Sequence, residues 1–120
     1  MEKIYTSLGL MSGTSMDGID ASIVRSDGED KYEVIFDQYF KYDEEIYREL
    51  VDIRNKINSP RDLEINSNLL DVIEKKITLF HANSCKKIIK DSLLNIDLIG
   101  FHGQTIFHNA NEKISKQLGD

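Results

Sequence analysis

The chain has 120 residues, which fits one ordinary domain, and its 40% hydrophobic and 30% charged residues are typical of a soluble globular protein. The net charge of −6 disfavours nucleic-acid partners, because affinity for nucleic acid depends mainly on lysines and arginines. The lack of a long apolar run, a start without signal-peptide layout and a single cysteine, Cys85, predict a cytoplasmic protein with no membrane partner.

The N-terminal segment predicts three strands in an antiparallel meander. Residues 3–10 are typical of a short buried strand, residues 19–26 alternate apolar and polar side chains, and residues 31–40 are rich in aromatic and β-branched types. Asp27-Gly28, flanked by acidic residues, indicates a turn between the second and third strands. Short connections of this kind join antiparallel neighbours.

Helical periodicity begins after this meander. In residues 43–57 isoleucine and leucine recur at helical spacing, with acidic residues in the first turn, where the helix dipole favours them. Ser59 suits the N-cap and Pro60 the first position of a second helical stretch, whose apolar stripe continues to about residue 93. Because this stretch is long for one helix, we expect a bend or break near Ser84, and we expect Asn95 to end it.

One further strand follows the helices. Residues 96–100 predict a short buried strand that is parallel in the βαβ sense, because a helix precedes it. The polar tail, residues 109–120, shows no closing element. The elements together predict an α/β fold: an antiparallel three-strand meander, then helices and a further parallel strand, in a sheet with an unpaired edge.

Residues 9–20, GLMSGTSMDGID, form the segment that is densest in small hydrogen-bonding residues. Gly13 and Gly18 permit backbone conformations that other residues resist, so the amides between them can converge on an anion, with nearby hydroxyl groups as further donors. Asp17 and Asp20 would repel a phosphate unless a divalent cation or its waters lay between. The segment therefore has the composition of a phosphate-binding loop without a lysine.

Three known loop patterns fail on this segment. The Walker pattern fails because Ile19 and Asp20 follow the second glycine in place of lysine and a hydroxyl residue. The dinucleotide pattern fails on spacing, and the nucleophile elbow G-x-S-x-G is broken by Asp17. Spacing alone leaves a glycine-rich hairpin turn and a ligand-binding loop equally open.

A second motif, GFHGQTIFH, covers residues 100–108. His102 stands between two glycines, and Gln104 and Thr105 add donors and acceptors at a predicted strand end, which faces the ligand crevice in an α/β sheet. A lone histidine at a tight turn would be structural. The density of polar residues favours a binding site.

A zinc site is the weaker interpretation of the histidines. His102 and His108 lie six positions apart, and His81 and Cys85 one helical turn apart, but neither pair follows a recognised zinc spacing. The sequence has no second cysteine, so we interpret His81 and Cys85 as helix-face residues, with the cysteine behaving as a small hydrophobe.

Both motifs resemble signatures of one family. GLMSGTSMDGID is similar to the N-terminal signature G-[VL]-M-S-G-T-S-x-D-G-[VI]-D of the anhydro-N-acetylmuramic acid kinases, and residues 99–108 resemble their second signature, I-G-x-H-G-Q-T-[VI]-x-H. Residues 117–120, QLGD, are similar to the family's Q-[IV]-G-[DN]. The resemblance implies a partial ribonuclease-H-like, actin-like ATPase domain of the actin/hexokinase/Hsp70 superfamily.

The resemblance also implies roles for particular residues. The first hairpin loop of this superfamily wraps the phosphates of ATP, which assigns to nucleotide binding Gly13, Thr14, Ser15, Met16, Asp17, Gly18, Ile19 and Asp20. The second signature is associated with the sugar, which assigns to the substrate side His102, Gly103, Gln104 and Thr105. Related superfamily members carry an acid where this chain has Met11, so we expect Asp17 or Asp20 to face Mg²⁺ through water.

An activity and its limits follow from the same resemblance. Family members open the ring of 1,6-anhydro-N-acetylmuramic acid with water and transfer the γ-phosphoryl of ATP to O6 with Mg²⁺, giving N-acetylmuramic acid 6-phosphate in peptidoglycan recycling. The catalytic aspartate and the second domain would lie beyond Asp120. Residues 1–120 would then be the N-terminal part of the first domain, with no catalytic residue. We expect no turnover by this chain alone, and a homodimer stays open for the intact enzyme.

Two other functions stay open from the sequence. The chain could be a non-catalytic remnant that binds nucleotide weakly or folds only with a partner that supplies the missing half. A serine hydrolase would use Ser15 as nucleophile with His102 or His108 as base. Asp17 and the strand predicted after the loop argue against the hydrolase.

Overall fold

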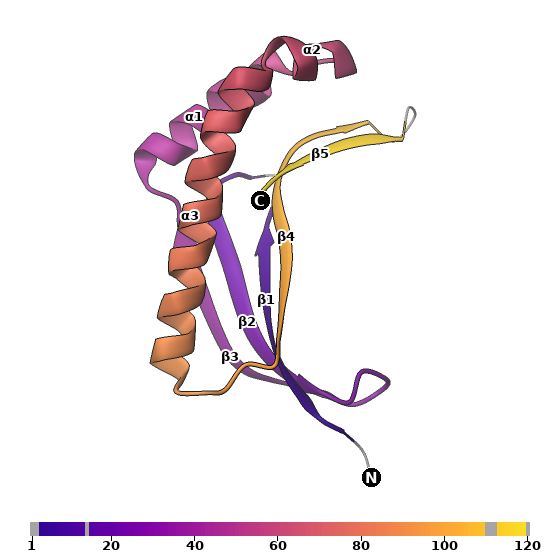
Figure 1. Cartoon of the computed structure of the whole chain (residues 1–120), viewed down its shortest axis with the longest axis vertical. Coiled ribbons are helices and arrows are strands. Elements are labelled where there is room, and N and C mark those ends of the chain that lie inside the picture. Colours follow the sequence, from indigo (N-terminus) through magenta and orange to yellow (C-terminus); the bar gives the residue numbers. More distant parts are fainter. Residues whose placement is uncertain (1–2, 14, 110–112, 120) are drawn as a thin grey trace.

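The computed structural model describes residues 3–13, 15–109 and 113–119, which form a five-stranded sheet and three helices (Figure 1). The strands are β1 (Tyr5–Ser12), β2 (Gly18–Ser26), β3 (Tyr32–Lys41), β4 (Leu98–Asn109) and β5 (Ile114–Leu118). The helices are α1 (Glu44–Lys56), α2 (Pro60–Ile65) and α3 (Ser67–Ser92). The sheet is mixed, with the strand order β3-β2-β1-β4-β5.

The three N-terminal strands form the predicted meander. β2 pairs antiparallel with both β1 and β3, and its alternation places Ile19, Ala21 and Ile23 in the core. β4 pairs in parallel with β1, because the helical connection returns the chain to the end of the sheet where β1 starts. The predicted α/β class and strand directions are confirmed.

The long helical stretch breaks at a different residue from the one expected. α2 ends at Ile65 and α3 starts at Ser67, because both the backbone and the side-chain amide of Asn66 donate to the carbonyl oxygen of Asp62. α3 then continues through Ser84, whose hydroxyl donates to the Phe80 carbonyl one turn earlier in the same helix. The helix ends at Ser92 rather than Asn95, since Leu93 adopts a left-handed conformation with φ 59°.

The C-terminal strands also correct two predictions. β4 is longer than predicted and contains the whole second motif, and its first residues, Leu98 and Ile99, are exposed rather than buried. The polar tail forms β5, which pairs antiparallel with β4 and buries Leu118 completely. At its end the amide of Gly119 donates to the Glu74 carboxylate of α3 at 3.1 Å. Polar composition concealed this strand, because its partner and its buried residue are set by the tertiary fold.

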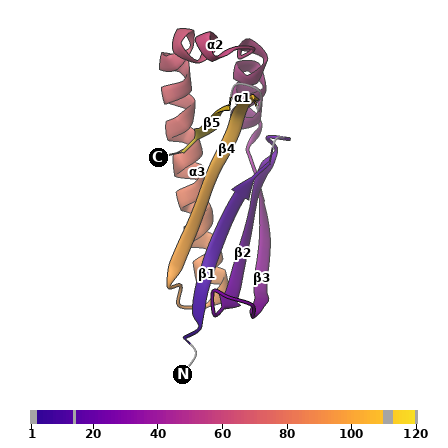
Figure 2. The same ribbon diagram turned by 90° about the vertical axis from the view of Figure 1, so that its right-hand side faces the viewer.

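The helices lie on one face of the sheet (Figure 2). The core between the layers joins strand residues such as Leu8 and Leu10 to Leu50 and Ile53 of α1 and to Ile77 of α3. No described residue forms a helix over the opposite side, which we call the open face. Its residues along the central strands include Gly9, Met11, Asp20, Ser22, Gly100 and His102. No helix of the described chain is long and apolar enough to cross a membrane.

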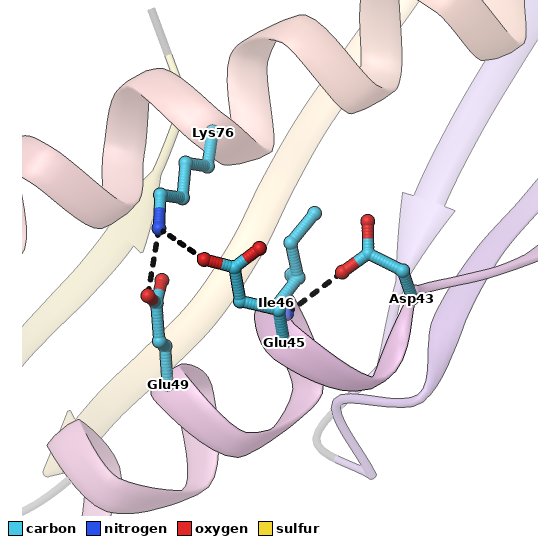
Figure 3. Close-up of polar contacts among 5 residues, drawn as sticks. All are labelled: Asp43, Glu45, Ile46, Glu49 and Lys76. Carbon is cyan, nitrogen blue, oxygen red and sulfur yellow. Dashed lines mark hydrogen bonds and ion pairs between the residues drawn. The ribbon is translucent and has the colours of Figure 1, made fainter.

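Polar contacts fix α1 at its start and against α3 (Figure 3). The Asp43 side chain accepts a hydrogen bond from the Ile46 amide and caps the helix N-terminus. The ammonium group of Lys76 on α3 binds Glu49 at 2.7 Å and Glu45 at 3.2 Å on successive turns of α1. The residue before the cap, Tyr42, is thereby held between the end of β3 and a fixed helix.

Candidate functional site

Residues 13–17 connect β1 to β2 and form the loop of the first motif, which we call the glycine loop. Met16 has φ 61°, its amide donates to the Gly13 carbonyl at 3.3 Å, and its side chain is buried in the core. The carbonyl oxygen of Asp17 accepts from the Tyr42 amide at 2.8 Å. The buried Met16 side chain and the bond from Tyr42 therefore hold the described part of the loop against the protein, and the bond from Met16 to Gly13 closes the loop on itself.

A group of four polar side chains, which we call the polar cluster, lies beneath the glycine loop. It consists of Ser12, Tyr42, His81 and Gln104, all buried. The Ser12 hydroxyl lies 3.1 Å from the Tyr42 hydroxyl and 3.2 Å from Nε2 of His81, and the Tyr42 hydroxyl donates to Oε1 of Gln104 at 3.0 Å. Buried polar groups need such partners, because each unpaired one costs about 1–3 kcal/mol.

Gln104 joins the two motifs directly. Its Nε2 group donates to the Gly13 carbonyl at 2.8 Å and to the Thr105 carbonyl at 3.0 Å. A bulge causes this inward orientation: the register of β1 against β4 shifts between Leu10 and Ser12, where Gly103 has φ +82°. The extra residue turns Gln104 toward the helices, whereas strict alternation would put it on the open face with His102.

Burial shifts the pKa of two members of the polar cluster. It raises the pKa of the Tyr42 hydroxyl to about 12 and lowers the pKa of His81, since water no longer solvates the charged forms. Nδ1 of His81 lies 2.8 Å from the Ile77 carbonyl, which can only accept, so this nitrogen carries the proton. The cluster is therefore a neutral hydrogen-bonded support.

Charged and hydroxyl groups lie on the outer side of the glycine loop. The exposed Ser15 hydroxyl donates to the Asp17 carboxylate at 2.8 Å, and this bond is the main reason why the pKa of Asp17 is lowered. The same carboxylate contributes to the raised pKa of Tyr39, after the effect of desolvation. An ionised Asp17 on the exposed side of the loop suits water-mediated contact with a divalent cation.

The two aspartates of the first motif line different hollows. Asp17 borders a hollow of about 660 Å³ with Lys41, Tyr42 and Glu44 at the end of β3. Asp20 borders a hollow of about 550 Å³ on the open face. Within the described ranges no group of three or more His, Cys, Asp or Glu residues could hold a metal ion. Mg²⁺ commonly takes one or two carboxylates together with substrate phosphates, and both Asp17 and Asp20 are exposed.

The residues assigned from sequence separate into inner and outer sets. The buried ones are Met16, Gly18, Ile19, Gly103 and Gln104, and Thr105 is half-buried. The exposed ones are Gly13, Ser15, Asp17, Asp20 and His102. Thr14 lies outside the described residues. Sequence reasoning missed Tyr42 as part of this site and placed His81 only on a helix face, because neither residue belongs to a recognisable motif.

Comparison with known proteins gives a single answer. The family model described as anhydro-N-acetylmuramic acid kinase matches residues 5–120. The chain belongs to this family. An anhydro-N-acetylmuramic acid kinase of Pelagibacter ubique is 66% identical over all 120 residues, and one of Agrobacterium fabrum is 37% identical over an alignment of 126 positions that covers the whole chain.

The match covers the whole of this chain but only part of each of these kinases. The chain spans 32% of the Pelagibacter kinase and 33% of the Agrobacterium kinase, about a third of the relatives' length. A further relative, from Rhizobium etli, is 36% identical with the same share covered. The family is thus one of phosphotransferases acting on a sugar, and the glycine loop and polar cluster lie in a chain that matches about a third of such a kinase.

Proposed function

We propose that the glycine loop, with the polar cluster beneath it, forms the phosphate-binding part of an ATP-dependent kinase. This kinase opens 1,6-anhydro-N-acetylmuramic acid and phosphorylates it at O6. The observation that carries the proposal is the bond from Gln104 to the Gly13 carbonyl, which joins the two signature motifs at one end of the sheet. The relatives' names support the sugar substrate, and a kinase reaction supports ATP as the phosphoryl donor. Because the proposed kinase uses ATP, we place it in the cytoplasm.

The chemistry proposed for the glycine loop needs no lysine. Phosphoryl transfer depends on positioning and on neutralising the charge of the phosphate oxygens, which backbone amides, hydroxyl groups and Mg²⁺ can do together. Gly13 and Ser15 are exposed for contact with the phosphates, as proposed from the motif, and Thr14 is included on the motif alone. Asp17, ionised and exposed, is the residue proposed to hold Mg²⁺ through water.

On the substrate side the proposal rests on the exposed member of the second motif. His102 lies on the open face beside Gly100, whereas Gln104 has both amide hydrogens and its carbonyl oxygen committed within the protein. We therefore assign sugar contact to His102 and the support of the glycine loop to Gln104. No residue of the described chain is assigned as the base that activates water.

The geometry disfavours a serine hydrolase. Its nucleophile would be Ser15, but the Ser15 hydroxyl donates to Asp17, and the described histidine that contacts a serine, His81, meets Ser12. A carboxylate two residues away holds the serine proton without the imidazole that a hydrolase needs. A fluorophosphonate probe should leave Ser15 unlabelled.

A chimera tests the kinase function. These 120 residues would replace the matching third of the Pelagibacter ubique kinase, which is 66% identical across them. With ATP, Mg²⁺ and the anhydro sugar, we expect formation of the 6-phosphate at a rate within about tenfold of the parent kinase. The isolated chain should give no turnover.

Two controls make the result decisive. The parent kinase shows that the assay works, and circular dichroism of the chimera shows that it folds. A folded chimera without turnover beside an active parent would contradict the proposed function. Turnover by the 120-residue chain alone would contradict the assignment of the catalytic base to another part of the protein.

A further inference from the structure

We propose that Tyr42 is a positioning residue that clamps both ends of the glycine loop. The inference rests on the proposed function, because the loop's position matters for catalysis only if the loop holds the nucleotide phosphates. Tyr42 belongs to neither motif and lies between the end of β3 and the N-cap of α1. Its link to the loop is visible only in the folded chain.

Two different groups of Tyr42 reach the two ends of the loop. Its backbone amide donates to the Asp17 carbonyl at 2.8 Å, where the loop enters β2. Its hydroxyl donates to Oε1 of Gln104 at 3.0 Å, and Gln104 donates in turn to the Gly13 carbonyl at 2.8 Å, where the loop leaves β1. One residue therefore holds the second end of the loop directly and the first end through a single intermediary.

The direction of each hydrogen bond can be assigned from the acceptors. Nε2 of Gln104 faces two carbonyl oxygens, which can only accept, so Oε1 must be the atom that faces Tyr42. The Tyr42 hydroxyl then has to donate its one proton to Oε1. Ser12 lies behind it at 3.1 Å, where its hydroxyl proton can be directed to the Tyr42 oxygen or to Nε2 of His81. Loss of the Tyr42 hydroxyl would leave Oε1 buried without this donor.

Packing keeps the Tyr42 ring in place. The side chain is 2% exposed, and its ring meets the edge of Phe80 on α3 with centroids 5.0 Å apart. The following residue, Asp43, caps α1, which Lys76 binds to α3. The hydroxyl group is thus presented to Gln104 from a rigid base.

The clamp has a specific consequence for an anion. Carbonyl oxygens repel phosphate, and the Gly13 carbonyl is one that the loop could otherwise turn outward. Gln104 and the Met16 amide both donate to this oxygen and keep it directed into the protein. Tyr42 fixes Gln104 and so keeps a repulsive dipole away from the phosphate side of the loop.

Tyr42→Phe in the chimera tests the clamp, because phenylalanine retains the ring contact and the backbone amide but removes the hydroxyl. We expect kcat/KM for ATP to fall about 10- to 100-fold, as for a loss of precise positioning, with KM for the sugar unchanged within about twofold. Tyr32→Phe is the matched control, since Tyr32 is 78% exposed at the far end of β3. It should leave both parameters unchanged.

A double-mutant cycle with Gln104→Met separates positioning from general stability. If Tyr42 acts through Gln104, removing its hydroxyl should have less than about a twofold effect once methionine replaces the amide. An equal fall of kcat/KM for ATP in both backgrounds would overturn the proposed route. Thermal unfolding of every variant shows which proteins are folded at the assay temperature.

Hydrogen exchange gives a readout that does not depend on turnover. Without nucleotide, the amide of Met16, which donates to the Gly13 carbonyl, should exchange at least about tenfold faster in Tyr42→Phe than in Tyr32→Phe. Unchanged exchange would overturn the clamp whatever the kinetics. Faster exchange in Tyr42→Phe, beside a folded chimera that shows no turnover even without the substitution, would support the clamp and contradict the proposed function.

Discussion

The two faces of the sheet differ in the kind of interaction that each carries. On the covered face β1 contributes Leu8 and Leu10 to the core and then Ser12 to the polar cluster, so the packing changes from apolar to hydrogen-bonded toward the glycine loop. On the open face the same strand shows Gly9 and Met11. The comparison shows that buried contacts are concentrated on one side of β1, whereas Gly9 and Met11 on the other side are exposed.

The largest expected loss of stability comes from a substitution in the core on the covered face. Leu50→Ala removes a side chain that is fully buried between α1 and the sheet, and we expect it to lower the free energy of unfolding by about 2–5 kcal/mol. Met11→Ala on the open face, 59% exposed, should change it by less than about 1 kcal/mol. Urea unfolding of both variants measures the difference, and equal losses would contradict the asymmetry of the faces.

A smaller loss of stability is expected at the β4 bulge, which directs the Gln104 side chain to the covered face. In Gly103→Ala the new Cβ would lie 2.7 Å from the Leu118 carbonyl oxygen at a residue with φ +82°, which we expect to cost about 1–3 kcal/mol. Gly9→Ala is the control, because its new Cβ would have no described atom within 4 Å and its φ is ordinary. Comparable unfolding curves for the two variants would show that the bulge tolerates a side chain.

Local patterns were sufficient to predict the meander and α1, because each element buries one face at a regular spacing. The motifs identified the glycine loop and the family. The break at Asn66 and the strand β5 could not be predicted, since one depends on competing hydrogen bonds and the other on pairing with β4. The polar cluster was also hidden: Ser12 meets His81 across 69 positions, and a bulge reverses the side of Gln104.

A pH titration compares the buried histidine with the exposed groups. Burial lowers the pKa of His81, so below the unfolded value of about 6.5 the unfolded chain binds a proton that the folded chain does not. Stability is therefore fully present above that pH and falls as the pH drops below it toward the lowered pKa of folded His81. His81→Gln should flatten this dependence in urea unfolding, and the exposed His108→Gln should not. A wild-type curve that is flat in this window would contradict a neutral His81.

The smallest expected change in the free energy of unfolding comes from replacing either of two lysines on α3. Lys76 bridges to Glu45 and Glu49 on another helix with 34% of its side chain exposed, whereas Lys87 meets Asp91 on its own helix at 3.4 Å and is 60% exposed. Lys76→Met should lower the free energy of unfolding by about 0.5–1 kcal/mol, and Lys87→Met by no more than about 0.5 kcal/mol. Because salt screens these pairs, about 1 M NaCl should reduce the difference. No loss from Lys76→Met would mean that apolar packing alone holds α1 against α3. Tyr42 would then owe its position to the core rather than to these ion pairs.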